Sequence, residues 1–152
     1  MEHFKLEIFQ NEKPGSSFPW FRSLSADEMW IIRQQLATAS KLPGNVTSLT
    51  LTKRIAELSS RCSDLNAEDE HFRLETVFQR LKINQPQMIY VNWYRYDKVD
   101  EMRFAEVADC FDYIWYPGSD DIDFFDATLS WVVSIDHAGY VSAVVFEDRT
   151  QA

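Results

Sequence analysis

The pattern of apolar and polar residues changes near residue 86, and this change divides the chain into a mainly helical part and a mainly β part. Ser25-Ala26-Asp27-Glu28 matches a capping box, in which the Ser25 hydroxyl accepts a hydrogen bond from the Glu28 amide and the Glu28 side chain reaches back. The helix that follows is expected to end before Pro43-Gly44. Its apolar stripe consists of Met29, Ile32, Leu36 and Ala39.

Three other elements are expected before residue 86. Phe4 to Phe9 alternates apolar and polar residues, which predicts a short strand. Residues 49–62 fit a helix with apolar residues at i, i+4 and i+7, although Leu49 to Thr52 also alternates as a strand would. Asn66 is expected to cap a third helix, which Asn84-Gln85-Pro86 ends.

After residue 86 the sequence favours strands. Met88 to Tyr96 and Phe111 to Tyr116 each predict a strand, and Asp100 to Ala108 between them predicts a short helix. The clearest signal is a series of three short strands with short loops, which predicts an antiparallel meander. The three strands are Ile122–Phe125, Ser130–Ile135 and Tyr140–Phe146. The loop before the last strand ends on Gly139, a residue that accepts positive φ.

Helices first and antiparallel strands last predict an α+β fold, with the N-terminal helices packed on one face of a C-terminal, mainly antiparallel sheet. A length of 152 residues fits a single domain over residues 1–152. Apolar residues make up 45% of the chain and aromatic residues 14%, which is enough to build a core without a disulfide or a structural metal.

Charge is unevenly distributed along the chain. Residues 97–152 hold 13 of the 24 acidic residues but only 3 of the 15 basic ones, so the acidic excess behind the net charge of -9 lies there. Such a field repels nucleic acid and anionic lipid, so binding to either is disfavoured and a basic protein partner is favoured.

Other features favour a protein of the cytoplasm. The first residues lack a signal-peptide pattern, and no apolar run is long enough to span a bilayer. Cys62 and Cys110 lie far apart and outside any metal-ligand spacing, so we expect two reduced thiols. The sequence predicts neither a cofactor nor a metal.

Aromatic residues gather in the same part of the chain as the acidic ones. Of the 22 aromatic residues, 14 fall between Tyr90 and Phe146, and many of them are expected in the core. Those beside the acidic turn predict a binding surface, because Tyr and Trp are enriched at hot spots and carboxylates speed the encounter with a basic partner. The predicted partner-binding residues are Trp115, Tyr116, Asp120, Asp121 and Asp123.

Two other functions stay open. An enzyme would use Asp121 and Asp123 as metal ligands or Cys110 as a nucleophile, although the spacing fails the Ca²⁺-loop pattern and no nucleotide or hydrolase motif is present. A self-associating structural module would pair through an exposed strand edge at Met88–Tyr96.

Three stretches of the C-terminal third carry a resemblance to a known group. Trp115 to Asp126, Leu129 to Val133 and Asp136 to Tyr140 resemble the C-terminal hairpin region of small bacterial α+β proteins, among them immunity proteins of polymorphic-toxin systems and the SMI1/KNR4-like group. The resemblance implies an intracellular, non-enzymatic binding protein and transfers no catalytic residue. We therefore expect a bacterial cytoplasmic protein of immunity or antitoxin type, whose acidic aromatic face binds a basic protein such as a nucleic-acid-directed toxin.

Overall fold

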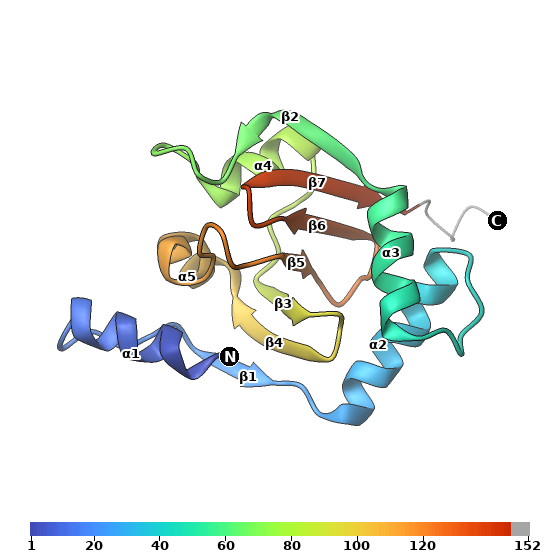
Figure 1. The fold of residues 1–152 in the computed structure, drawn as a ribbon, viewed down its shortest axis with the longest axis horizontal. Coiled ribbons are helices and arrows are strands. Elements are labelled where there is room, and N and C mark those ends of the chain that lie inside the picture. Colours follow the sequence, from blue (N-terminus) through green and yellow to red (C-terminus); the bar gives the residue numbers. More distant parts are fainter. Residues whose placement is uncertain (147–152) are drawn as a thin grey trace.

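A computed structural model describes residues 1–146 and has an α+β fold (Figure 1). The α-helices are α1 (His3–Glu12), α2 (Ala26–Ala39), α3 (Ser48–Leu58), α4 (Leu74–Leu81) and α5 (Phe104–Asp109), and a short 3-10 turn, η1, covers Phe111–Tyr113. The strands are β1 (Phe21–Ser23), β2 (Ser60–Asn66), β3 (Met88–Tyr94), β4 (Lys98–Arg103), β5 (Ile122–Phe125), β6 (Trp131–Ile135) and β7 (Tyr140–Val145). Within the described residues, no helix is both long and apolar enough to cross a membrane.

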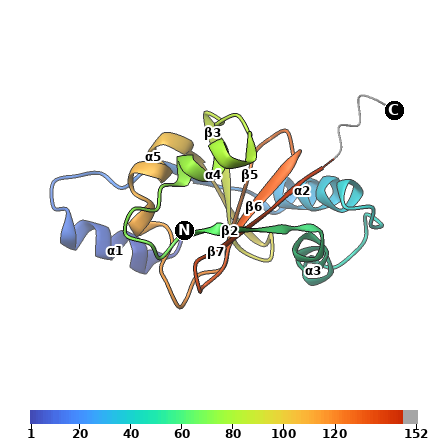
Figure 2. The ribbon, with the colours of Figure 1, turned by 90° about the horizontal axis from the view of Figure 1, so that it is seen from above.

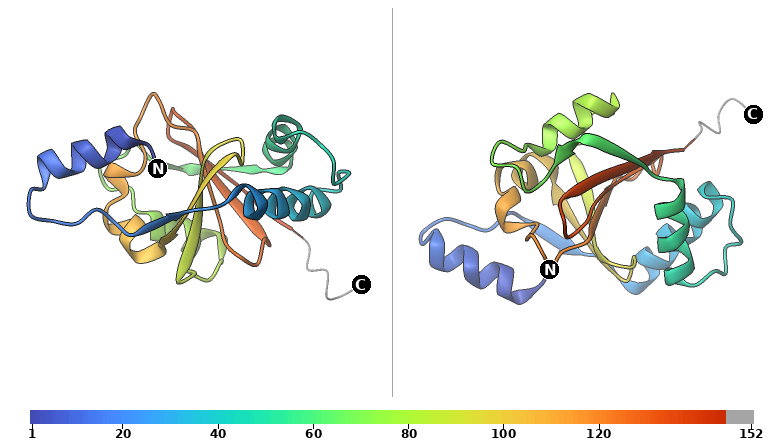
Figure 3. Two further views of the ribbon diagram at one scale, coloured as in Figure 1. Left: turned by 90° about the horizontal axis from the view of Figure 1, so that it is seen from below. Right: turned by 45° about the horizontal axis from the view of Figure 1, so that its top comes forward.

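The strands form one seven-stranded sheet in the order β1-β4-β3-β5-β6-β7-β2, and every neighbouring pair is antiparallel. The predicted meander is confirmed, since β5, β6 and β7 are consecutive neighbours. Gly139 has φ +87 in the turn before β7, as expected. The sheet is not purely C-terminal, however, because the helical half supplies both of its edges, β1 and β2. In Figure 3, β1 comes forward in the left view and β2 in the right view.

Helices cover both faces of the sheet, so the prediction that they pack on one face is wrong. Figure 2 shows α2 and α3 to one side of the strands and α1, α4 and α5 to the other. The apolar core is divided in the same way. On β6, Trp131, Val133 and Ile135 belong to one cluster, while Val132 belongs to the other. Both faces of the central strands are therefore buried, which explains their nearly continuous apolar sequence.

Two predicted elements of the first half have a different structure. Phe4 to Phe9 lies inside α1 and is not a strand; its two buried residues, Lys5 and Phe9, are spaced i, i+4 as on one side of a helix. Asn66 ends β2 and does not cap a helix. Its side-chain Oδ1 accepts a hydrogen bond from the Glu68 amide at 2.8 Å, so the residue stabilises a turn, and α4 begins only at Leu74.

Two elements of the second half also differ from the prediction. The first part of Asp100 to Ala108 belongs to β4, and the helix starts at Phe104. Phe111 to Tyr116 is not a strand, because it begins with the 3-10 turn η1. The helix start at Ser25 is confirmed: its Oγ accepts a hydrogen bond from the Glu28 amide at 3.1 Å, and Glu28 Oε1 accepts one from the Ser25 amide at 3.1 Å.

Candidate functional site

Three of the five predicted partner-binding residues lie together in a largely buried cluster behind the surface. Trp115 is 4% exposed, and its Nε1 donates a hydrogen bond to the Asp120 carbonyl at 3.1 Å. Asp120 is 7% exposed, and its Oδ2 accepts a hydrogen bond from the Tyr116 amide at 2.8 Å. Burial leaves Trp115 and Asp120 little surface to offer a partner, while Tyr116 is half-buried.

The Asp120 carboxylate has a specific cation inside the fold. Lys5 of α1 is 0% exposed, and its Nζ lies 2.6 Å from Asp120 Oδ2 and 2.7 Å from the Ile114 carbonyl oxygen. The same ammonium lies 4.5 Å from the ring centroid of Trp93. A buried charge is tolerated when an opposite charge and hydrogen bonds replace its water, and Lys5 and Asp120 provide both for each other. This contact fixes α1 to the loop before β5.

A second buried carboxylate, Asp100 of β4, has the same kind of role. Its Oδ2 accepts a hydrogen bond from Trp93 Nε1 at 2.8 Å and pairs with the α-amino group of Met1 at 2.6 Å. Its Oδ1 accepts a hydrogen bond from Ser23 Oγ of β1 at 2.7 Å. Asp100 thus joins β1, β3 and β4. No local sequence pattern predicts this role, because the spacing of apolar residues places Asp100 in a helix.

The other two predicted residues, Asp121 and Asp123, lie outside this cluster. Asp123 belongs to a polar row of cross-strand neighbours that runs across five strands. The row consists of Asn92, Asp123, Ser134, Ser142 and Arg61. Asn92 Nδ2 donates to Asp123 Oδ2 at 2.8 Å, and Ser134 Oγ donates to Oδ1 at 2.5 Å. Burial raises the pKa of the Asp123 carboxyl, although these two hydrogen bonds act in the opposite direction.

Asp121 is the one predicted site residue with a largely exposed side chain, at 68%. Its Oδ1 accepts hydrogen bonds from the His137 backbone amide at 2.8 Å and contacts His137 Nδ1 at 2.9 Å. The hydrogen bond and the charge of Asp121 raise the pKa of His137. Tyr140, at the start of β7, is 43% exposed, and the Arg61 guanidinium lies 4.0 Å from its ring centroid.

A surface groove combines acidic and aromatic residues more directly than the predicted set. It has a volume of about 450 Å³ and lies between the loop after β2 and the segment formed by α5 and η1. This acidic groove is lined by Ala67, Asp69, Glu70, Phe72, Arg73, Ala108, Asp109, Phe111 and Asp112. Its four carboxylates are on exposed residues, and none is in an ion pair within residues 1–146.

Aromatic rings support the floor of the acidic groove. The rings of Phe72 and Phe111 lie 5.2 Å apart, and Phe111 stacks on Trp115 with 6.1 Å between ring centroids. Trp115 therefore lies behind the groove and positions its floor, although it is not itself a lining residue. The sequence missed Asp69, Glu70 and Asp109, because the first two were assigned to a helix. The available signal was the acidic run Glu68-Asp69-Glu70.

The described residues offer little support for the two alternative functions, an enzyme and a self-associating module. Within residues 1–146, no group of three or more His, Cys, Asp or Glu side chains is placed to hold a metal ion. Burial raises the pKa of the Cys110 thiol, whereas a nucleophilic cysteine requires a lowered pKa. Met88 to Tyr94 is β3, which pairs with both β4 and β5, so the proposed edge for self-association is inside the sheet.

No family model, curated protein or solved structure matches the chain. The fold therefore defines the protein as an α+β domain with a seven-stranded antiparallel sheet. Its functional class has to be inferred from the charge and shape of its surface, where the acidic groove is the feature that best fits a ligand of defined chemistry.

Proposed function

We propose that this chain is a non-enzymatic binding protein of the bacterial cytoplasm, of immunity or antitoxin type, and that its acidic groove binds a basic segment of a partner protein. The observation that carries the proposal is the combination of four exposed carboxylates and two phenylalanine rings in one groove of about 450 Å³. The resemblance of the C-terminal third to immunity proteins favours the same class of function.

Each component of the acidic groove has a part in this recognition. Asp69, Glu70, Asp109 and Asp112 attract lysine and arginine side chains and raise the rate of encounter. The half-buried Phe72 ring, which the buried Phe111 ring supports from behind, offers apolar surface to the methylene stems of those side chains, and the face of a ring also attracts a cation. Arg73, the one basic residue among the described lining residues, would favour a partner with an acceptor beside its basic residues.

A toxin that acts on nucleic acid fits this description, because it needs a basic surface to bind phosphate groups. A protein that covers this surface with carboxylates would block access of the nucleic acid to it. The free thiols of Cys62 and Cys110 are compatible with a reducing compartment.

The test begins with capture of binding proteins from a lysate of the native host, followed by purification of the retained protein and kinetic measurement of its binding. Asp69→Asn/Asp112→Asn removes two groove charges, and Glu7→Gln/Glu57→Gln removes two exposed charges from α1 and α3. We expect the groove variant to raise Kd by about 3- to 10-fold, mainly through a slower association rate, and to weaken the salt dependence. Equal effects of the two variants would show that the groove is not the binding surface.

A further inference from the structure

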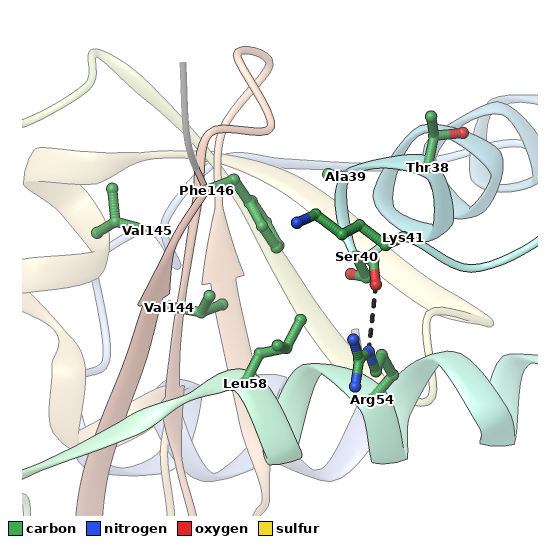
Figure 4. A pocket seen from close by; sticks show the side chains of 9 residues that line it. All are labelled: Thr38, Ala39, Ser40, Lys41, Arg54, Leu58, Val144, Val145 and Phe146. Atoms are coloured by element: carbon green, nitrogen blue, oxygen red, sulfur yellow. Dashed lines mark hydrogen bonds between the residues drawn. The ribbon is translucent and has the colours of Figure 1, made fainter. Parts of the chain in front are cut away.

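A second pocket, unlike the acidic groove in charge, lies between the C-terminal end of α2, the side of α3 and the end of β7 (Figure 4). Its volume is about 430 Å³, within the ~300–1,000 Å³ typical of small-molecule sites. This basic pocket is lined by Thr38, Ala39, Ser40, Lys41, Arg54, Leu58, Val144, Val145 and Phe146. Figure 1 shows α2 and α3 at the opposite end of the sheet from α5, so the two sites are separate.

The polar side of the basic pocket is cationic. Lys41 follows α2 with a left-handed backbone conformation (φ 60), and Figure 4 shows its side chain extending toward Phe146. It is in no ion pair within residues 1–146. Arg54 Nε donates to the Ser40 carbonyl at 3.1 Å, and Nη1 is 3.4 Å from Glu57 Oε2. Arg54 thus donates a hydrogen bond to the carbonyl at the C-terminal end of α2, and its Nη2 remains as a donor for a ligand.

Ser40 adds a polar group that the fold itself does not satisfy. The residue is 1% exposed, and its Oγ has no hydrogen-bond partner within the described residues. A buried hydroxyl without a partner is costly, and such groups in native proteins commonly have a ligand or a water molecule as partner. Ser40 lines the pocket beside Lys41 and Arg54, so this hydroxyl lies next to the two cations, just beneath the pocket surface.

The remaining surface of the pocket is apolar. Leu58 ends α3, and Val144 and Val145 end β7. Leu58 is 36% exposed although it is large and aliphatic, and Phe146 packs on the same face of β7 as Val144. The Val145 side chain is exposed on the opposite face of the strand and lies apart from Val144 in Figure 4. Apolar surface left open beside two cations fits a ligand with an apolar body and an anionic head group, and it disfavours fully polar anions such as phosphate.

We propose that the basic pocket binds a small aliphatic carboxylate, with its carboxylate between Lys41 and Arg54, beside Ser40, and its chain over Leu58, Val144 and Phe146. The site is independent of the acidic groove and does not rest on the proposed protein partner. It adds a small-molecule ligand to a chain whose net charge of -9 would otherwise repel such an anion, so the local pair of cations determines the specificity.

The test is a ¹H–¹⁵N chemical-shift titration of the whole chain with sodium octanoate, and with 1-octanol and octylammonium as neutral and cationic counterparts. We expect saturable shifts at the amides of Ser40, Lys41, Val144 and Val145 with octanoate, and clearly weaker binding of the other two compounds. Equal binding of octanol, or shifts centred away from these residues, would overturn the proposal.

Two matched variants make the charge requirement specific. Lys41→Gly removes the cation, and glycine accepts its left-handed conformation without strain. Lys82→Gly makes the same change at Lys82, which caps α4 with φ 57 and does not line the pocket. Lys41→Gly is expected to weaken octanoate binding by about fivefold, the upper range for one partly exposed ion pair, and Lys82→Gly to leave it unchanged. Equal affinities of the two variants would refute the assignment of Lys41.

Discussion

The buried cluster around Lys5 and the acidic groove use the same kind of side chain for opposite purposes. Asp120 and Asp100 are almost fully buried, and each has a cation and hydrogen-bond donors inside the fold. Asp69 and Asp112 are exposed and have no ion pair within residues 1–146. The comparison shows that acidic residues next to aromatic ones in sequence do not by themselves define a surface, because burial decides whether a carboxylate stabilises the protein or remains free for a partner.

The largest effect is expected at Lys5. Lys5→Met removes the cation from Asp120 and leaves a buried carboxylate unpaired, so we expect the free energy of unfolding to fall by about 3–5 kcal/mol. Lys13→Met, at the exposed C-terminal end of the same helix, is the control and should change it by less than about 0.5 kcal/mol. Urea unfolding followed by tryptophan fluorescence measures both. Similar losses in the two variants would show that the Lys5–Asp120 pair adds little to stability.

A smaller loss is expected at Asp100. Asp100→Asn keeps the size of the side chain but removes the charge opposite the Met1 amine and one of two acceptor oxygens, so the unfolding free energy should fall by about 2–3 kcal/mol. The matched control is Asp97→Asn in the β3–β4 turn, where the exposed pair with Arg33 contributes about 1 kcal/mol or less. Thermal or urea unfolding of both variants tests the difference, and a milder effect at Asp100 than at Asp97 would contradict it.

Asp123 should change the pH dependence of stability. Because burial raises its pKa above the ordinary value of 3.8, the folded state keeps the proton at a pH where the unfolded state has lost it. This contribution stabilises the fold at low pH and is lost as pH rises through the folded pKa. Asp123→Asn removes the dependence, so the variant should gain stability relative to the native chain as pH increases. Unfolding curves at several pH values measure the unfolding free energy of both proteins. If the stability of the variant relative to the native chain stayed constant or fell as pH increased, the expected direction would be wrong.

The smallest effect on stability is expected in the acidic groove. Asp69→Asn/Asp112→Asn removes two exposed charges that have no partner within the described residues, so the unfolding free energy should change by less than about 0.5 kcal/mol per substitution. The same variant is the one expected to weaken partner binding. A large loss of stability would show that these carboxylates support the fold, and the contrast with Asp100 and Asp120 would then fail.

The sequence predicts correctly those elements that depend on residues close together in the chain. The capping box fixed the start of α2, and turn residues such as Gly139 marked the meander of β5, β6 and β7. Phe4 to Phe9 was assigned to a strand because six residues contain too few turns to distinguish a period of two from one of 3.6. The spatial order of the strands depends on pairs distant in sequence, such as Phe21 with Met102, and no local pattern encodes those.

For the candidate site, the sequence predicts the kinds of residue, acidic and aromatic, but not which particular residues form it. An acidic region rich in aromatic residues is present, but none of the five predicted partner-binding residues lines the acidic groove. The particular residues differed because the buried or exposed state of Asp120 depends on Lys5, a residue at the other end of the chain. The acidic groove likewise combines the loop after β2 with α5 and η1, and sequence alone does not show that these segments are neighbours.

The position of β1 and β2 at the two edges of the sheet has a consequence for synthesis on the ribosome. Both strands emerge early, yet β1 pairs with β4 and β2 pairs with β7, the last strand in the described part of the chain. Lys5 likewise emerges long before Asp120, its buried partner. A nascent chain that stops before Tyr140 would carry β2 with no strand beside it. We therefore expect this sheet to complete its folding only after β7 has left the ribosome, with slow kinetics that reflect these distant contacts.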